Sequence, residues 1–515
     1  MENERFVEIK LNEKQKEAFD AINSGQSILL TGSAGTGKTS VIKLFYQLKR
    51  DPNQKIALTS TTGVSAVLVG GTTLHSYLGI GLGTNSTEKL VKKITSSTFY
   101  RARWTKLETL IIDEVSMMPP ELFDKLELMA RQIRKSKGVL VDTEDDPGNK
   151  PFGGIQLVLS GDFCQLPCVR NDRFVFEAES WGSCVKKTVY LEEIIRQSDP
   201  LFQKCLNEVR VAKLSEEAVD VLSGLWDNKS TNEFGIRPTR IYPVNAAVDK
   251  VNTKELNKLV GELREYEMEI KIHKTKFFDQ VARYKKNIKA VEKLTLAENA
   301  QVMLLANLDV EDGLVNGSRG VVTGFVEDIP VVRFMNGREK LIDYHAWDIE
   351  EIDEKVATIY QVPLKLAYAC TVHSSQGLSL DCVEINMQNF FEYGQAYVAL
   401  SRARNLKGLR VKNFDEKLIK AHPMALKFYA DLKSQYNDPS DGRQRCSAPL
   451  KTLIKHCAVL LRHGIVLSSD DRDLSECKKR LKEWLRKNHP DKGGDSDECK
   501  EVNSAFDAVF GGVVF

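Results

Sequence analysis

The sequence shows no strong excess of charge of either sign, because 73 lysines and arginines nearly balance 71 acidic residues and leave a net charge of +2. This balance excludes a uniformly basic coat for nucleic acid, so any nucleic-acid site must be a local groove. No run of about 18 apolar residues occurs, which excludes an ordinary transmembrane helix. We therefore expect no membrane partner.

The ten cysteines form no CxxC pair and no Cys/His cluster at zinc spacing, which favours free thiols in a reducing compartment. The opening residues MENERFVEIK lack the basic start and apolar core of a secretory signal, so we expect an intracellular protein. No mitochondrial presequence is evident, which favours the nucleus or a viral replication site over the mitochondrion.

Short apolar segments alternate with helical stretches in the first 200 of the 515 residues. This alternation predicts an α/β fold with a parallel sheet, which binds ligands at the carboxyl ends of its strands. Residues 261–298 are rich in charge and have a composition typical of helices. Residues 300–350 are typical of short strands, which suits a small β-module inserted in a second α/β domain. The strands expected in the first domain are residues 27–31, 55–60, 109–113 and 156–160.

A glycine-rich segment, GSAGTGKT, follows the first expected strand and opens a helix, in the pattern G-x-x-x-x-G-K-[ST]. Glycines let backbone amides surround phosphate oxygens, and the helix presents the positive end of its dipole. An accidental glycine-rich turn is the alternative, and the flanking strand and helix disfavour it. We assign the phosphate site to Gly32, Ser33, Ala34, Gly35, Thr36, Gly37, Lys38, Thr39 and Ser40.

Two adjacent carboxylates, Asp113 and Glu114, end another apolar strand. Asp113 can hold Mg²⁺, together with the Thr39 hydroxyl, and Glu114 can take a proton from an attacking water. Such a pair is ordinarily a solvated turn, but the phosphate loop upstream favours the functional interpretation. The chain is therefore predicted to hydrolyse a nucleoside triphosphate.

Three further residues have candidate roles at the phosphates. Gln165, in GDFCQLP, follows an apolar strand and can sense the γ-phosphate. Arg196, in LEEIIRQSD, and Arg402, in YVALSRARN, could stabilise charge in the transition state. A surface salt bridge is the ordinary alternative for either arginine.

Ten strings, in order over roughly residues 8–435, resemble the Pif-type DNA helicases of superfamily 1B. The resemblance implies two RecA-like domains, Mg²⁺ as cofactor, ATP as substrate, 5′→3′ translocation on single-stranded DNA and unwinding at junctions with duplex DNA. The strings are LNEKQKEAFD, GSAGTGKT, TTGVSAVLVGGTTLHSYLGIGLG, LIIDEVSMM, PFGGIQLVLSGDFCQLP, LEEIIRQSD, AQVMLLANLD, LVNGSRGVVTGF, ACTVHSSQGLSL and FEYGQAYVALSRARNLKGL.

The resemblance also assigns roles to particular residues. Gln15 would read adenine, Arg196 and Arg402 would be arginine fingers, and Gln376 and Gly377 would couple the ATP cleft to DNA. Lys38, Asp113, Glu114 and Gln165 complete the catalytic set. The DNA-contacting residues would be Thr62, Gly63, Thr73, His75, His373, Ser375, Gln376 and Gly377.

Mapped onto the chain, the resemblance places the first RecA-like domain at residues 1–195, with a strand-separating wedge near 84–106. The second would span 196–436, with an SH3-like insert near 300–355. Two positions depart from the family pattern: Cys168 replaces a proline, and Ser374 replaces a lysine near the expected DNA track. We expect neither change to be inactivating.

A linker at 437–449 precedes a helical unit, residues 450–515, whose HPDKGGD turn joins two amphipathic stretches. This unit resembles the J-domains of DnaJ-type co-chaperones, especially those of polyomavirus large T antigens. By that resemblance His489, Pro490 and Asp491 would bind a DnaK-type chaperone. A helical hairpin with a fortuitous HPD is the alternative.

Two alternative functions stay open at this point. The motor could act mainly on RNA or RNA–DNA hybrids, or on G-quadruplex DNA, and the protein could be a chaperone adaptor placed on DNA by its motor. The sequence leaves its pathway, host and oligomeric state undetermined.

Overall fold

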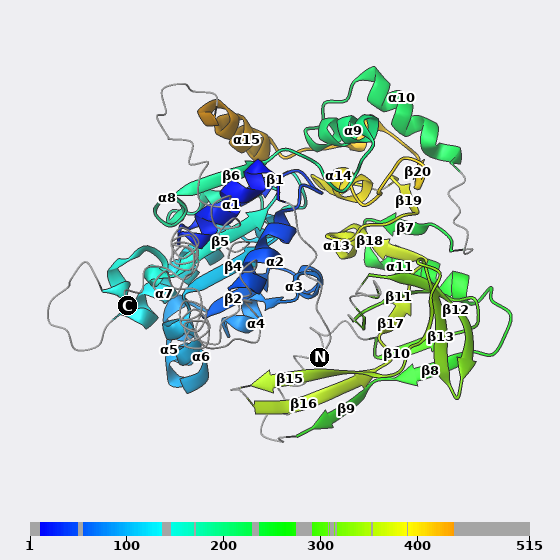
Figure 1. The fold of residues 1–515 in the computed structure, drawn as a ribbon, viewed down its shortest axis with the longest axis horizontal. Helices are drawn as coiled ribbons and strands as arrows, with labels where there is room; N and C mark the ends of the chain where they lie inside the picture. Colours follow the sequence, from blue (N-terminus) through cyan, green and yellow to red (C-terminus); the bar gives the residue numbers. More distant parts are fainter. Residues whose placement is uncertain are drawn as a thin grey trace, which may run out of the picture.

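The computed structural model describes residues 11–436, except 50–54, 136–145, 169–170, 229–235, 274–290, 307, 310–313, 315–316, 352–353 and 389. The predicted linker and J-domain-like unit, with His489, Pro490 and Asp491, lie outside the described residues. Two α/β parts lie side by side, and a β-rich part adjoins the second (Figure 1). Within the described ranges, no helix is long and apolar enough to cross a membrane.

The first part is built on a six-stranded sheet in the order β3-β2-β4-β5-β1-β6, with all pairs parallel, as predicted. Its strands are β1 (Ile28–Gly32), β2 (Ile56–Ser60), β3 (Thr72–Thr73), β4 (Thr109–Asp113), β5 (Gln156–Gly161) and β6 (Lys187–Leu191). Its helices are α1 (Glu13–Asn23), α2 (Lys38–Leu48), α3 (Gly63–Val69), α4 (Leu74–Tyr77), α5 (Thr87–Ser96), α6 (Thr98–Lys106), α7 (Pro120–Arg134) and α8 (Trp181–Cys184).

Both faces of this sheet are covered by apolar cores. In β4, Leu110 and Ile112 point into one core and Ile111 into the other, because successive side chains of a strand point to opposite faces. Continuous apolar strands are what a parallel sheet buried on both sides requires. Burial of each such side chain contributes about 1.5–3 kcal/mol to the stability of the fold. The polar residues at the strand ends are therefore held by a rigid sheet.

The second part has a four-stranded parallel sheet, β18-β7-β19-β20. One face packs in an apolar core, while Arg240, Glu384 and Arg410 form a row across the other face. The strands are β7 (Thr239–Tyr242), β18 (Ala369–Thr371), β19 (Val383–Asn386) and β20 (Leu409–Lys412). The helices are α9 (Pro200–Arg210), α10 (Glu216–Gly224), α11 (Asn245–Leu256), α13 (Val372–Ser375) and α14 (Gln395–Leu400).

The β-rich part has its own apolar core and lies between α11 and β18 in the chain. The prediction of helix for residues 261–298 is wrong for the described residues there. They form β8 (Arg264–Glu267), β9 (Glu269–Ile272) and β10 (Lys293–Leu296). Charged residues alternate with buried ones such as Tyr266, Leu294 and Leu296, which is a strand period. The other strands are β11 (Gln301–Leu304), β12 (Arg319–Val326), β13 (Ile329–Phe334), β14 (Glu339–Leu341), β15 (His345–Glu351), β16 (Glu354–Gln361) and β17 (Leu364–Leu366). An SH3-like arrangement for this part stays a prediction.

The last described helix, α15 (Pro423–Tyr436), returns to the first part, where Figure 1 shows it beyond β6. Ala425, Tyr429 and Leu432 enter the core of the first sheet. The Phe428 ring stacks on Phe176, with ring centroids 4.5 Å apart. The division at residues 195 and 196 placed this helix with the second domain, but its packing is with the first.

Candidate nucleotide-binding and active site

The phosphate loop connects β1 to α2 and passes through two left-handed glycines, Gly35 (φ 81°) and Gly37 (φ 83°). A Cβ on Gly35 would lie 2.7 Å from Cβ of Arg196, and one on Gly37 would lie 2.5 Å from Nε2 of Gln15. Gly35 therefore needs glycine for both its backbone angle and its close neighbour, and Gly37 needs it chiefly for its backbone angle.

Lys38 opens α2 and folds back over the loop. Its Nζ donates to the carbonyl oxygens of Gly32 at 2.8 Å and Ser33 at 2.9 Å. Burial lowers the pKa of Lys38, while the nearby charges of Asp162 and Glu114 raise it. The ammonium is thus held at the mouth of the loop by weak carbonyl partners that a phosphate oxygen could replace.

Asp113, at the end of β4, is buried and accepts three hydrogen bonds. The donors are Oγ of Ser160 at 2.7 Å, the backbone N–H of Glu114 at 3.0 Å, and Oγ1 of Thr39 at 3.3 Å. A hydroxyl beside a carboxylate fits Mg²⁺, which prefers oxygen ligands. Among the described residues no group of three or more His, Cys, Asp and Glu could hold a metal, so most ligands of such an ion would come from phosphates and water.

Glu114 has a left-handed backbone, with φ of 54°, which is strained for a non-glycine residue and is typical of functional sites. Burial, together with the charge of Asp113, raises the pKa of Glu114 to about 7. Nε2 of Gln376, from just after α13, donates to its Oε2 at 2.8 Å. A carboxylate with a pKa near neutrality suits a general base.

A cavity of about 780 Å³ lies between the two parallel sheets and contains this constellation. A volume of several hundred Å³ is usual for small-ligand sites. The first part of the chain supplies Gln15, Ala34, Gly35, Gly37, Lys38, Thr39, Ser40, Asp113, Glu114 and Gln165 to its lining. Arg196 lies between the two parts in the chain, and Gly377, Arg402 and Arg404 come from the second part.

Arg402 and Arg196 lie at the cavity with carbonyl and hydroxyl partners rather than in surface salt bridges. Arg402 is buried and donates to the carbonyl oxygens of Val398 at 2.8 Å and Leu378 at 3.2 Å. Arg196 Nη1 donates to the carbonyl oxygen of Ser401 at 3.3 Å. Burial, and then the charge of Arg196, lower the pKa of Arg402 to about 9. Two cations at the cavity that form no ion pair with a carboxylate among the described residues are suited to an anionic ligand.

The two candidate glutamines are also placed at the cavity. Gln15 is buried within the first turn of α1, where its Oε1 accepts from the N–H of Asn12 and its Nε2 donates to the carbonyl oxygen of Thr36 at 3.0 Å. Gln165 is 5% exposed and follows the turn at the end of β5. Both side chains therefore line the cavity that contains the phosphate loop, and their roles there stay a prediction.

Sequence reasoning missed several cavity residues, of which Lys43 and Arg404 are charged. Lys43 lies four residues after Thr39, one helical turn on, and Arg404 is two residues after Arg402. Helical spacing could have found the first. The apolar residues Leu11 and Ile195 offered no comparable signal, because apolar side chains are ordinarily core.

The predicted DNA-contacting residues fall into two groups. Thr62, Gly63, Thr73 and His75 lie at the starts of α3 and α4. His373, Ser375, Gln376 and Gly377 lie in or just after α13, and Gly377 approaches Leu68 of α3. Ser375 is fully buried and its hydroxyl donates to the carbonyl oxygen of Val372, so this residue is not exposed to a DNA strand in the structure.

Comparison with known proteins gives consistent matches. The PIF1-like helicase model matches residues 10–230, and the model of the DNA helicase Pif1 2B domain matches residues 284–325. The crystal structure of Pif1 helicase from Candida albicans is 34% identical, with a TM-score of 0.70, over 82% of this chain and 100% of that chain. The chain belongs to the Pif1-like helicase family.

Other members differ in how much of their length is matched. ATP-dependent DNA helicase PIF1 of Xenopus laevis is 39% identical over 83% of this chain and 65% of its own length, so this chain spans just under two thirds of that relative. Uncharacterized protein 030L of Invertebrate iridescent virus 6 is 36% identical over 84% of this chain and 96% of its own length. A Bacteroides Pif1 helicase in complex with ADP-AlF3 and ssDNA is 29% identical, with a TM-score of 0.59, over 83% of this chain and 98% of that chain.

The departure at Ser374 has a structural explanation in this Pif1-like chain. Its hydroxyl accepts from the N–H of Thr371 at 2.9 Å, and its own N–H donates to Oγ1 of Thr371 at 3.1 Å. The side chain thus caps α13 instead of reaching outward as a lysine would. Cys168 is half-buried, and burial raises the pKa of its thiol, which favours an unreactive neutral form.

Proposed function

We propose that this chain is an ATP- and Mg²⁺-dependent DNA helicase that moves 5′→3′ on single-stranded DNA and unwinds duplex DNA at junctions. The cavity between the sheets carries this proposal, because its phosphate loop and carboxylates come from one part and Arg402 from the other. Hydrolysis in such a site requires both parts to close on the nucleotide. The Bacteroides relative with ADP-AlF3 and ssDNA supports the same pairing of ligands.

Each residue has a role that follows from its position. The loop amides and Lys38 would bind the phosphates, and Gln15, which contacts the loop at Thr36, would contact adenine. Thr39 and Asp113 would hold Mg²⁺, which when bound neutralises phosphate charge. Glu114 would accept the proton of the attacking water, while Gln165, Arg196 and Arg402 stabilise the transferring group.

The hydrogen bond from Gln376 to Glu114 offers a route from DNA to hydrolysis. Gln376 follows α13, whose His373 is among the predicted DNA contacts, and its amide reaches the general base at 2.8 Å. A strand bound along α13 would shift this amide and thereby the carboxylate. Hydrolysis would then accelerate on single-stranded DNA.

Strand separation is proposed for α5 and α6, which occupy the predicted wedge region. Arg103 lies over the Phe99 ring, 3.9 Å from its centroid, and 4.9 Å from the Tyr77 centroid. This cation–aromatic cluster fixes α6 against α4. A wedge held in this way could keep its shape against the end of a duplex.

The test is steady-state ATPase of the chain without polymer and with single-stranded DNA, single-stranded RNA, RNA–DNA hybrid, G-quadruplex DNA and blunt duplex. Lys38→Ala should abolish activity, and Lys204→Ala, at an exposed lysine outside the cavity, should leave it unchanged. Strong stimulation by single-stranded DNA supports the proposal. Equal rates with and without every polymer would contradict it, and preference for RNA or hybrid would favour the alternative substrate.

A second function, recruitment of a DnaK-type chaperone, is favoured by the HPD motif at His489, Pro490 and Asp491. It rests on sequence alone. The test is a pull-down of a purified DnaK-type chaperone with the full chain, its His489→Gln variant and His463→Gln as the matched control. Loss of binding in His489→Gln alone supports recruitment, whereas equal binding by all three chains contradicts it.

A further inference from the structure

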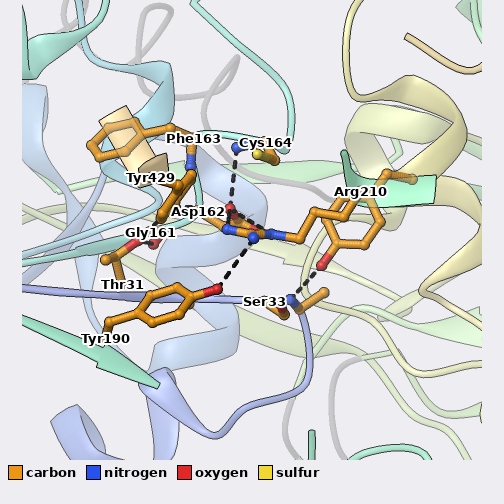
Figure 2. Close-up of polar contacts among 12 residues, drawn as sticks. Thr31, Ser33, Gly161, Asp162, Phe163, Cys164, Tyr190, Arg210 and Tyr429 are labelled. Atoms are coloured by element: carbon orange, nitrogen blue, oxygen red, sulfur yellow. Dashed lines mark hydrogen bonds and ion pairs between the residues drawn. The ribbon is translucent and has the colours of Figure 1, made fainter. Parts of the chain in front are cut away.

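A buried ion pair lies behind the phosphate loop, outside the lining of the nucleotide cavity (Figure 2). Asp162 follows β5 and is fully buried, and Arg210, the last residue of α9, is 5% exposed. Arg210 donates from Nη2 to Oδ1 of Asp162 at 2.8 Å and from Nε to Oδ2 at 3.1 Å. Burying a charge pair this completely costs folding free energy unless the remaining hydrogen-bonding groups of both residues also have partners.

Tyr429 of α15 makes one of the remaining hydrogen bonds, to Asp162, and Figure 2 shows it beside the pair. Its hydroxyl donates to Oδ1 of Asp162 at 3.0 Å, accepts from the N–H of Phe163 at 3.1 Å, and lies 2.7 Å from Oγ1 of Thr31. Its ring covers the Arg210 guanidinium, 4.3 Å from centroid to Cζ. One hydroxyl therefore touches both β1 and the turn after β5.

The two segments that Tyr429 contacts lead directly to the phosphate loop and to Gln165. Thr31 immediately precedes Gly32, where the phosphate loop begins. Asp162 opens the turn that ends at Gln165: its Oδ1 accepts from the N–H of Cys164 at 3.1 Å and its carbonyl oxygen from the N–H of Gln165 at 3.0 Å. The position of Gln165 relative to the loop thus depends on contacts made by a helix from the far end of the described chain.

We propose that Tyr429 is a positioning residue for ATP hydrolysis, whose hydroxyl holds the turn from Asp162 to Gln165 against β1 so that Gln165 meets the γ-phosphate. The inference rests on the proposed function, because it needs hydrolysis at this site. If Tyr429 were purely structural, its substitution would change the free energy of unfolding. If it is a positioning residue, its substitution changes kcat through Gln165.

Tyr429→Phe tests this, because it removes the hydroxyl and keeps the ring over Arg210. Tyr190→Phe is the matched control, because the Tyr190 hydroxyl accepts from Nη1 of Arg210 at 3.3 Å, at the arginine end of the same ion pair. With saturating single-stranded DNA, we expect kcat of Tyr429→Phe to fall about tenfold, with KM for ATP within about twofold. Tyr190→Phe should match the wild-type chain, and both should melt within a few degrees of it.

A double variant shows whether the effect passes through Gln165. In a Gln165→Ala background, Tyr429→Phe should cause no further loss of kcat, because the side chain that it positions is gone. Wild-type kcat in Tyr429→Phe, an equal loss in Tyr190→Phe, or the full tenfold loss on top of Gln165→Ala would each overturn the inference. A wild-type chain without any ATPase activity would contradict the proposed function and this inference with it, whereas an active wild type with normal Tyr429→Phe contradicts the inference alone.

Discussion

The two parallel sheets differ in what covers them and in what they bring to the nucleotide cavity. The first is buried on both faces and ends in the phosphate loop and both carboxylates. The second buries one face, carries the row of Arg240, Glu384 and Arg410 on the other, and reaches the cavity chiefly through arginines. Under the proposed function, one sheet holds the nucleotide and the other completes its chemistry.

The strongest test of this comparison is Arg402→Ala. Because Arg402 comes from the second part, which is proposed to act in hydrolysis rather than in nucleotide binding, kcat should fall by about 10³-fold or more while ATP affinity changes far less. Stopped-flow binding of a fluorescent ATP analogue and steady-state ATPase would measure the two quantities. Arg410→Ala, on the outer face of the same sheet, is the control and should retain kcat. Equal losses of affinity and kcat in Arg402→Ala would contradict the division of roles.

A second test concerns the ion pair that connects the two parts. Burial raises the pKa of Asp162, but the charge and hydrogen bonds of Arg210 outweigh burial, so its pKa lies below the ordinary value. A carboxyl with a lowered folded pKa adds stability above its unfolded pKa of about 4, and that stability disappears as pH falls through the folded pKa. The free energy of unfolding should therefore drop steeply as pH falls below about 4.

Asp162→Asn should weaken this pH dependence by the contribution of Asp162 and, by leaving Arg210 without its carboxylate, cost about 3–5 kcal/mol at neutral pH. Urea unfolding between pH 3 and pH 7, followed by tryptophan fluorescence, measures both effects. Unchanged stability at neutral pH would show that the connection between the parts does not depend on this pair.

The smallest expected effect is that of Ser374→Lys, which restores the residue typical of the family. Loss of the α13 cap should cost about 1 kcal/mol of stability, while one added cation near the DNA track should tighten binding to single-stranded DNA a few fold at low salt. The slope of log K against log salt should steepen by about 0.7. Fluorescence anisotropy at several salt concentrations measures this, and an unchanged slope would place position 374 away from the DNA backbone.

The residues that sequence predicts best are those whose chemistry is local. The phosphate loop, Asp113 and Glu114 all follow apolar strands, so both the fold and the site there could be read from neighbouring residues. Arg196 and Arg402 looked like ordinary surface arginines, and only family strings singled them out. Several of their partners are backbone carbonyls distant in sequence, Ser401 for Arg196 and Leu378 for Arg402, which no local pattern predicts.

Other features escaped sequence reasoning for physical reasons. The strands around Tyr266 and Leu294 carry so many charged residues that their alternation looked helical. Helix α15 shows an apolar side, but amphipathicity does not indicate which of several cores receives it. The Asp162–Arg210 pair was also missed, because its residues are 48 positions apart and come from different parts of the fold.

The return of α15 has a consequence for how the protein is made. Thr31 and Tyr429 are in contact although 398 residues separate them. At about 5–20 residues per second, a ribosome needs about 20 to 80 s to make that interval. Throughout this time Ala425, Tyr429 and Leu432 are not yet available to cover the apolar face of the first sheet. The nascent chain therefore exposes an apolar surface until its last described helix has been made.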